Sequence, residues 1–167
     1  MDIVQILGWQ EIALRLGSAT LIGGLLGLNR ELKGKPAGLR TNALVALASA
    51  MLILGAQKVA GGADPELAAN VVSRAIQGIV TGIGFLGAGV ILRDTSGSKV
   101  HGLTTAATIW LTAILGILCG AGLWPLAVIG LALTLVILVL GRPLEKYLHR
   151  RFPELSDHEH DEPPRTG

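Results

Sequence analysis

An uncharged, glycine-rich stretch at residues 75–92 constrains the fold of this chain more than any other feature. It holds 18 residues without a charged side chain, includes five glycines, and is bounded by Arg74 and Arg93. An α-helix needs about 18–20 apolar residues to cross a bilayer. Each glycine inside a helix costs about 1 kcal/mol relative to alanine in water, whereas in lipid small residues let helices approach closely. The stretch therefore predicts a packed transmembrane helix.

Composition places the whole chain in the same class. Of its 167 residues, 50% are hydrophobic and 16% are charged, and the mean hydropathy is +0.57. Soluble domains carry about 25% charged residues. Cys119 stands alone, which excludes an internal disulfide and a cysteine-based zinc site. A net charge of +2 without a basic stripe disfavours nucleic-acid binding, and without a basic leader and cleavage motif we expect no signal peptide to be removed.

Charged residues set the number of predicted helices. Only 14 uncharged residues separate Arg15 from Arg30, so the first helix must begin near Trp9 and include Glu11, which can pair with Arg15 four residues later. The 40 residues between His101 and Arg142 hold no formal charge and accommodate two helices. They are broken at residues 120–125, where Pro125 suits an early helix position. We expect an all-α integral membrane protein, a compact bundle with helices at residues 9–29, 41–58, 75–92, 102–119 and 125–141.

The distribution of lysine and arginine predicts the orientation. Ten basic residues follow the first, third and fifth predicted helices, and positively charged loops stay in the cytoplasm. We therefore expect the N-terminus outside and the C-terminus in the cytoplasm, with one membrane domain at residues 1–151. Residues 152–167 are polar, acidic and proline-bearing and predict a disordered cytoplasmic tail. His158 and His160 within it are too few for a metal site.

Pairs of glycines four residues apart occur in three predicted helices. These glycines are Gly23, Gly27, Gly78, Gly82, Gly116 and Gly120. Such spacing is typical of faces where helices approach closely. Packing inside the bundle is the favoured interpretation, and a homodimer is the alternative. The spacing Gly82, Gly84, Gly87 also matches a dinucleotide-binding fingerprint, but that motif requires a strand before it, so we treat the match as accidental.

Polar side chains recur at helical spacing within two predicted helices. In the fourth helix they are His101, Thr105, Thr108 and Thr112. In the third they are Asn70, Arg74, Gln77 and Thr81. Thr81, His101 and the three later threonines could line a path or form a buried network, although threonine hydroxyls also bond their own helix. No Asp or Glu lies deep in a predicted helix, which argues against a cation path, and no constellation predicts a metal, cofactor or catalytic site.

The predicted cytoplasmic face is the richest in charge. Arg30, Glu31 and Arg40 stand at helix ends around a short glycine-containing loop, a placement that favours a fixed network. Attraction to anionic lipid headgroups is a second interpretation of these charges. With the interfacial pair Arg74 and Gln77, they make up the polar set that we expect to be functional.

Three blocks of sequence resemble the MgtC/SapB family of bacterial membrane proteins. The blocks read GGLLGLNRE at 23–31 with KPAGLRT at 35–41, RAIQGIVTGIGFLGAG at 74–89, and VHGLTTAATIW at 100–110. The resemblance implies a five-helix domain of the bacterial inner membrane. It also implies a link to growth in low magnesium and, in pathogens, to survival inside host cells, so the family is associated with virulence. Longer members carry a soluble C-terminal domain, whereas here we expect only the short acidic tail after residue 151.

Two functions from different classes follow from the resemblance. The leading hypothesis is a non-enzymatic protein of magnesium homeostasis that binds and regulates other membrane machinery, such as the ATP synthase or a transporter. The alternative is a Mg²⁺ transporter or channel, as family members were first labelled. A weaker third option is an assembly module that dimerises through its glycine faces.

Overall fold

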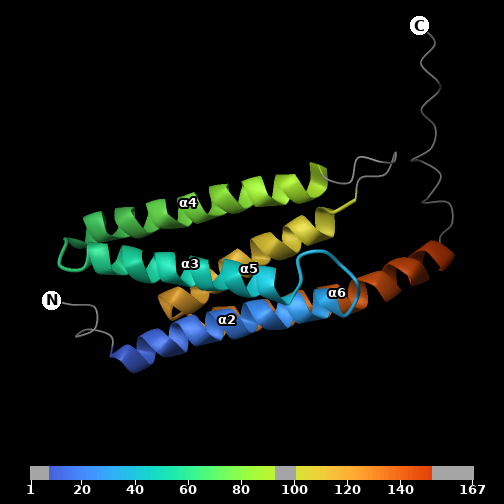
Figure 1. Cartoon of the computed structure of the whole chain (residues 1–167), viewed down its shortest axis with the longest axis horizontal. Helices are drawn as coiled ribbons and strands as arrows, with labels where there is room; N and C mark the ends of the chain where they lie inside the picture. The colour runs from blue at the N-terminus through green and yellow to red at the C-terminus, as the bar shows by residue number, and fades with distance from the viewer. Residues whose placement is uncertain (1–7, 93–100, 152–167) are drawn as a thin grey trace, which may run out of the picture. The chain divides into compact units, whose positions relative to one another are not determined.

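Five α-helices make up the part of the chain that the computed structural model describes, residues 8–92 and 101–151 (Figure 1). They are α2 (Trp9–Glu31), α3 (Leu39–Ala60), α4 (Pro65–Leu92), α5 (Leu103–Ala121) and α6 (Trp124–Arg151). No strand occurs within those ranges. All five helices are long and apolar enough to cross a membrane. The prediction of an all-α protein with five membrane-spanning helices is confirmed, whereas the orientation of its ends stays a prediction, and the tail at 152–167 lies outside the described residues.

Two helices extend further than expected, because a charged residue ends an apolar run without ending a helix. Helix α4 begins at Pro65, ten residues before the predicted start at 75. The Asp64 carboxylate accepts hydrogen bonds from the backbone N–H groups of Glu66 (3.1 Å) and Leu67 (3.0 Å), and proline suits the first helical position. Helix α6 likewise continues beyond the predicted end at 141, through Pro143, to Arg151.

The break between the last two helices lies where glycine and proline predict it. Gly122 ends α5 in the left-handed conformation (φ 76°). Its N–H donates to the carbonyl of Cys119 (3.0 Å), and that of Leu123 donates to Leu118 (2.9 Å), which satisfies the last carbonyls of the helix. Pro125 then occupies the second position of α6.

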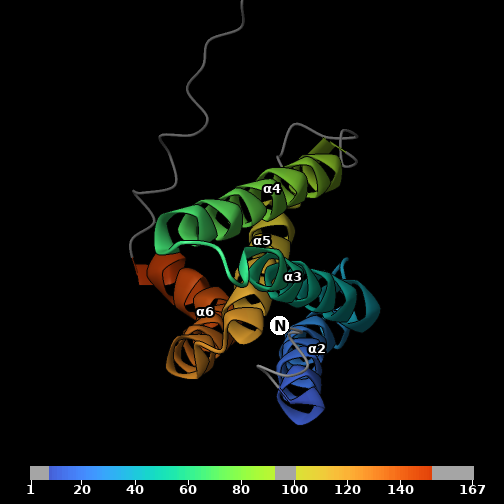
Figure 2. The same cartoon turned by 90° about the vertical axis from the view of Figure 1, so that its left-hand side faces the viewer.

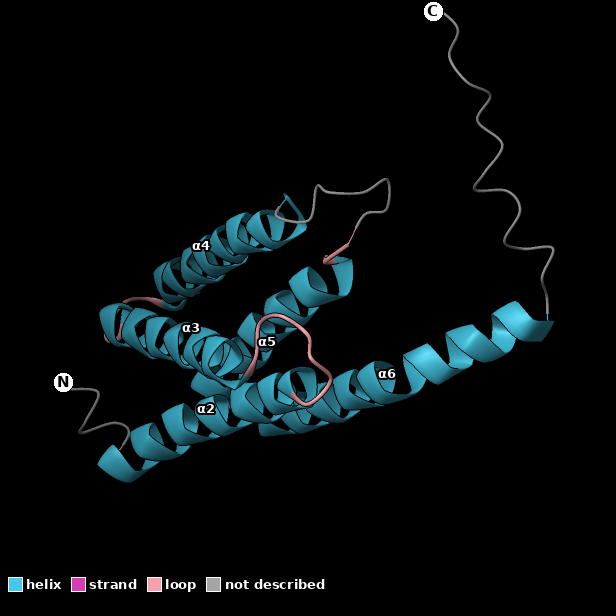
Figure 3. Cartoon of the chain, turned by 45° about the vertical axis from the view of Figure 1, so that its right-hand side comes forward, coloured by secondary structure: helices cyan, strands magenta, loops and turns pink. Residues whose placement is uncertain are grey.

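Helices α3 and α5 form the centre of the first compact unit of the chain, which ends at Leu131. Each of them packs against α2, α4 and the other, so that α2 and α4 flank the central pair (Figure 2). Between α3, α4 and α5 lies an apolar cluster of Ile53, Ile79, Ile83, Ile109, Ala113 and Ile117. From Ala132 onward α6 belongs to a second unit, and Figure 3 shows this part of α6 as one continuous helix.

Two of the three glycine pairs bring backbones into contact. A Cβ added at Gly27 of α2 would lie 2.5 Å from the carbonyl oxygen of Gly38, and one at Gly23 would overlap the carbonyl of Asn42. On α5, a Cβ at Gly120 would lie 2.7 Å from the carbonyl oxygen of Ala50, and one at Gly116 would overlap Ala46. No side chain fits at these distances, so glycine sets the spacing of α2 and α5 from α3.

The third pair behaves differently. A Cβ added at Gly78 or at Gly82 would meet no atom within 4 Å. The expectation that this pair also packs inside the bundle is therefore wrong for this chain. The physical reason is its place on α4, where the core contacts come from Ile79 and Ile83 and the glycines lie away from them.

Candidate functional site

A buried polar network joins α2, α3 and α5 at the end of the bundle where α2 ends. Its charged member is Arg30, which is only 4% exposed. The guanidinium Nη2 donates a hydrogen bond to the hydroxyl of Thr105 on α5 and a longer one to the carbonyl of Pro36 (3.4 Å). Arg30 also stands in the last turn of α2, where a positive charge is favoured by the helix dipole. A buried guanidinium is tolerated only with such polar partners.

Asn42 on α3 is the second anchor of the network and is fully buried. Its Nδ2 donates to the carbonyl oxygens of Ala37 (2.5 Å) and Gly38 (3.0 Å), and its Oδ1 accepts from the hydroxyl of Thr112 on α5 (2.8 Å). Thr112 also lies 2.8 Å from the carbonyl of Thr108. A single hydroxyl proton is shared between these two acceptors, so Thr112 links α5 to α3 while it remains bonded to its own helix.

Arg30 and Asn42, together with Glu31, also hold the loop between α2 and α3. Glu31 accepts a hydrogen bond from the backbone N–H of Leu39 through Oε2 (2.9 Å). Ala37 adopts a positive φ of 58°, a conformation that costs a residue with a Cβ about 1–2 kcal/mol. Because its carbonyl then meets Asn42, the buried amide offsets part of this cost. Arg30, Glu31 and Asn42 together fix the loop at three points.

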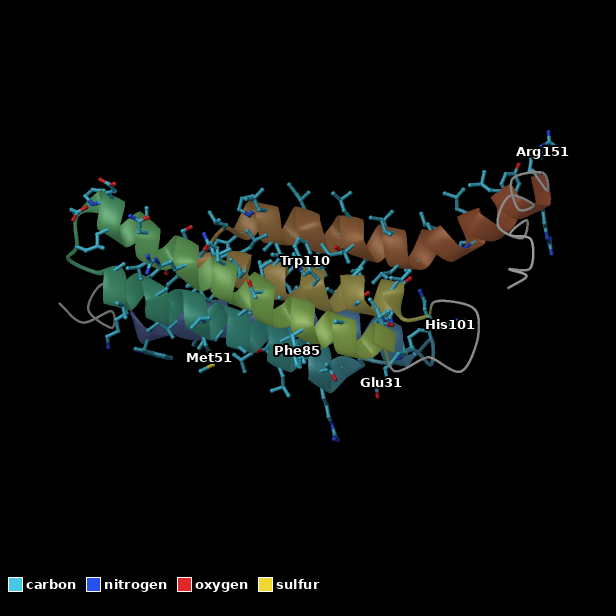
Figure 4. All side chains as sticks on the ribbon, turned by 90° about the horizontal axis from the view of Figure 1, so that it is seen from above. Glu31, Met51, Phe85, His101, Trp110 and Arg151 are labelled. Carbon is cyan, nitrogen blue, oxygen red and sulfur yellow. The ribbon has the colours of Figure 1, made fainter. Side chains whose placement is uncertain are left out.

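The structure separates several residues that the sequence grouped together. Thr105, Thr108 and Thr112 do share one buried face of α5. His101 does not continue that face, because it is exposed and precedes the helix, and Gly102 (φ 94°) turns the chain between them. Arg40 is exposed on α3, apart from the buried Arg30. Figure 4 shows His101 and Glu31 near the loop end of the helices.

Helix α4 carries a second set of polar residues, on the face that points away from α3 and α5. Its members are Asn70, Arg74, Gln77 and Thr81, all exposed. We call these four residues the α4 stripe. The Gln77 amide donates to the hydroxyl of Ser73 (3.3 Å). Because Ile79 and Ile83 turn the opposite side of the helix into the core, Gln77 and Thr81 do not meet the threonine face of α5.

The network has little capacity to hold a cation. Its oxygens belong to hydroxyl and amide groups rather than carboxylates, and those of Thr105 and Asn42 already accept hydrogen bonds. The Arg30 guanidinium stands at one end of the network. Thr105 and Thr112 lie seven residues apart, about 10 Å along the helix, so a cation between them would meet the positive charge at short range. Among the side chains that the structure describes, no group of three or more His, Cys, Asp or Glu residues is placed to hold a metal.

Comparison with known proteins identifies the family. A family model described as the MgtC family matches residues 16–147, which include all five helices in whole or in part. The chain belongs to the MgtC family. It is 47% identical to protein SrpB of Synechococcus elongatus over 137 residues, which cover 78% of this chain and 74% of SrpB.

Relatives named MgtC are similar at the same level but longer. This MgtC-family chain is 42% identical to protein MgtC of Brucella abortus over 133 residues and 46% identical to that of Salmonella typhimurium over 125 residues. The matches cover 80% and 75% of this chain but only 52% and 48% of those proteins. The chain therefore spans about half the length of these relatives. No solved structure matches it.

Sequence reasoning missed Asn42, which the structure of this family member places at the centre of the network. The signal was available, since Asn42 lies in the 17-residue uncharged run between Arg40 and Lys58, and a polar amide inside a membrane helix calls for a partner. The predicted pair of Glu11 and Arg15 is confirmed at 2.7 Å. Arg15 also donates to the carbonyl of Gly120 (2.9 Å) and so ties α2 to the end of α5.

Proposed function

We propose that this MgtC-family protein serves magnesium homeostasis in the bacterial inner membrane by binding and regulating another membrane protein. It acts without catalysing a reaction and without carrying Mg²⁺ itself. The observation that supports this proposal is which polar side chains face the interior of the bundle and which are exposed. The side chains of the buried network bond one another and backbone carbonyls, whereas the α4 stripe is exposed.

The chemistry of Mg²⁺ supports regulation over transport. Mg²⁺ requires near-octahedral oxygen coordination and is usually held through carboxylates and retained waters. The buried network supplies neutral hydroxyl and amide oxygens and no carboxylate, together with a guanidinium that repels cations. The link to magnesium itself comes from the family resemblance and from the relatives that are named MgtC. An ATP synthase or a transporter is the kind of partner that the resemblance implies.

A flux measurement tests the mechanism directly. The purified full chain is reconstituted in liposomes that contain a trapped Mg²⁺ indicator, with empty liposomes and liposomes of the T105V/T112V variant as controls. We expect Mg²⁺ entry equal to that of empty liposomes. Entry that requires the protein and changes in T105V/T112V would establish the transporter alternative and overturn the regulatory proposal.

A growth measurement tests the physiological role. A strain that lacks the gene is grown in low and in high magnesium, with and without a plasmid that carries the full chain. We expect a growth defect in low magnesium alone, which the plasmid corrects. Equal growth of the deletion strain and its parent at every magnesium concentration would refute the proposed role.

A further inference from the structure

The α4 stripe points directly away from the bundle. Thr81 lies midway between Ile79 and Ile83, two residues from each, and each step of two residues turns the helix by about 200°. Both isoleucines are buried against α3 and α5, so the hydroxyl of Thr81 faces the opposite side. Asn70, Arg74 and Gln77 are exposed on that same side. Polar residues of a membrane helix normally face the interior of the bundle. On α4 they face away from it, and the apolar side packs inward.

Part of the stripe lies at the depth of the lipid tails. Helix α4 has 28 residues and is about 42 Å long, which exceeds the roughly 30 Å hydrocarbon layer. Arg74 stands 18 residues before Leu92, about 27 Å along the axis, and therefore near one boundary of that layer. Gln77 and Thr81 lie about 4.5 Å and 10.5 Å deeper. Arg74 can reach a lipid phosphate from the boundary, but acyl chains offer no hydrogen bond to Gln77 or Thr81.

Two side chains of the stripe, Arg74 and Thr81, have no partner among the described residues of their own unit, and Gln77 bonds only Ser73 of the same helix. Arg74 makes no hydrogen bond or ion pair with any described side chain of its own unit, residues 8–92 and 101–131. Thr81, unlike Thr108 and Thr112, makes no bond to its own helix in those ranges. In hydrocarbon an unpaired polar group is costly. The stripe therefore favours an occupant that supplies hydrogen-bonding groups at the depth of Gln77 and Thr81 and an anion in place of lipid phosphate at Arg74.

Beside the stripe, α4 is shaped for a close neighbour. Gly78 and Gly82 leave open space where a Cβ would stand, and Phe85, labelled in Figure 4, is 82% exposed one turn further on. The same four-residue spacing at Gly116 and Gly120 is where α5 receives the backbone of α3. That internal example shows how a second helix can approach α4 in this fold.

We infer that the α4 stripe docks a transmembrane helix of another protein, one that bears a carboxylate at the depth of Arg74 and small or hydrogen-bonding residues opposite Gln77 and Thr81. The inference rests on the proposed function, for which it names the surface and the chemistry of the partner. Charge complementarity selects this occupant, because a carboxylate forms a charge-assisted, bidentate pair with a guanidinium.

A second copy of the chain does not fit the stripe. Two copies inserted in the same direction are related by an axis along the membrane normal, so that each residue near the axis faces its own equivalent. Arg74 would then face Arg74 of the second copy. The carboxylate of Glu66 in the same helix lies eight residues away, about 12 Å along the axis, which is too far to relieve the repulsion.

Binding of a designed helix tests the inference. The probe is a synthetic leucine–alanine transmembrane peptide with two glycines four apart, an energy acceptor at one end, and a single Glu placed to meet Arg74. A matched peptide carries Lys in its place. Each is reconstituted with the full chain in liposomes, and energy transfer from the three tryptophans reports association. We expect the Glu peptide to bind at least about tenfold more tightly than the Lys peptide, and R74E to reverse that preference.

Two glycine variants separate docking from folding. G82L places a large side chain on the proposed surface, and G55L places the same side chain on an exposed part of α3, where Gly55 is equally open. We expect G82L to abolish peptide binding and G55L to leave it unchanged, with equal helical content by circular dichroism. Equal binding of the two peptides, or an unchanged preference in R74E, would overturn the inference.

The alternative occupant has its own signature. In membranes, oxidation of a T81C variant would give a disulfide-linked dimer if a second copy covered the stripe, and that result would also overturn the inference. We expect T81C to stay monomeric, as G55C does. Failure of the docking inference can be told apart from failure of the proposed function. If the peptide fails to bind while low-magnesium growth still depends on the chain, the docking surface is wrong and the function stands.

Discussion

Replacement of Gly116 by alanine should separate close packing from helix propensity. A Cβ at this position would overlap the carbonyl oxygen of Ala46 and lie 2.8 Å and 3.0 Å from the Cα and carbonyl carbon of the same residue. All three are backbone atoms of α3, so no side-chain rotation can relieve the contact. Carbon atoms prefer a separation of about 3.5–4.0 Å, so α5 must move from α3 by roughly 0.7 Å.

The expected magnitude follows from that movement. A gap of 0.5–1 Å forfeits about a quarter to a half of each atomic contact, and overpacking typically costs about 1–3 kcal/mol. Alanine recovers at most about 1 kcal/mol of helix propensity. At Gly78 the propensity gain has no opposing term, because a Cβ there meets nothing within 4 Å. We therefore expect G116A to unfold with a free energy about 1–3 kcal/mol lower than that of G78A.

The assay is equilibrium unfolding in mixed micelles, in which dodecylmaltoside is replaced stepwise by sodium dodecyl sulfate and tryptophan fluorescence reports the transition. G55A, at another open glycine, is the matched control and should behave as G78A does. If G116A and G78A changed the free energy of unfolding by the same amount, glycine would not set the spacing between α3 and α5, and the packing argument would fail.

Three further substitutions test the buried network in the same assay. N42A removes the acceptor of Thr112 and the donor to two loop carbonyls, so the free energy of unfolding should fall by about 1–3 kcal/mol; an unchanged value would show that the amide is replaceable. A37G should raise it by up to about 1 kcal/mol, because glycine adopts a positive φ without strain; a loss would refute the strain at the loop. T105A leaves the Arg30 guanidinium buried with one partner fewer. It should lower the free energy of unfolding more than R30M does, because R30M removes the buried charge itself. The reverse order would show that the guanidinium contributes net stability.

The helices could be predicted from the sequence because the bilayer imposes a length and a composition on each of them. The extra turns of α4 do not follow from hydropathy, and their signal is instead the capping Asp64 followed by Pro65. Which face of a helix packs against its neighbours could not be predicted from the sequence either. Gly78 and Gly116 have the same spacing to a second glycine, yet one lies open and the other touches a backbone. That difference depends on which neighbours pack against the helix, and spacing within one helix does not encode it.

The candidate site was recovered in part for the same reason. Arg30 stood out as a charge at a helix end beside a short loop, and the threonines stood out as polar residues in an apolar run. Each pattern is local to one helix. Their meeting is not local, because the hydroxyl of Thr105 reaches a guanidinium 75 residues earlier in the chain. Asn42 could have been noted as an amide within an apolar run, but its partners could not, because they depend on α5 and on a loop conformation at Ala37 that no residue type predicts.

The long separation within the buried network has a consequence for how the protein is made. The contacts of Arg30 and Asn42 with α5 join residues 75 and 70 positions apart, and ribosomes add about 5–20 residues per second. The first two helices therefore wait about 4–15 s for the helix that completes their polar contacts. During this interval a guanidinium and an amide must be held by lipid headgroups or by the insertion machinery. Arrival of α5, which packs against α2, α3 and α4, both closes the network and assembles these four helices, so the buried arginine makes completion of the bundle a late, single event of biosynthesis.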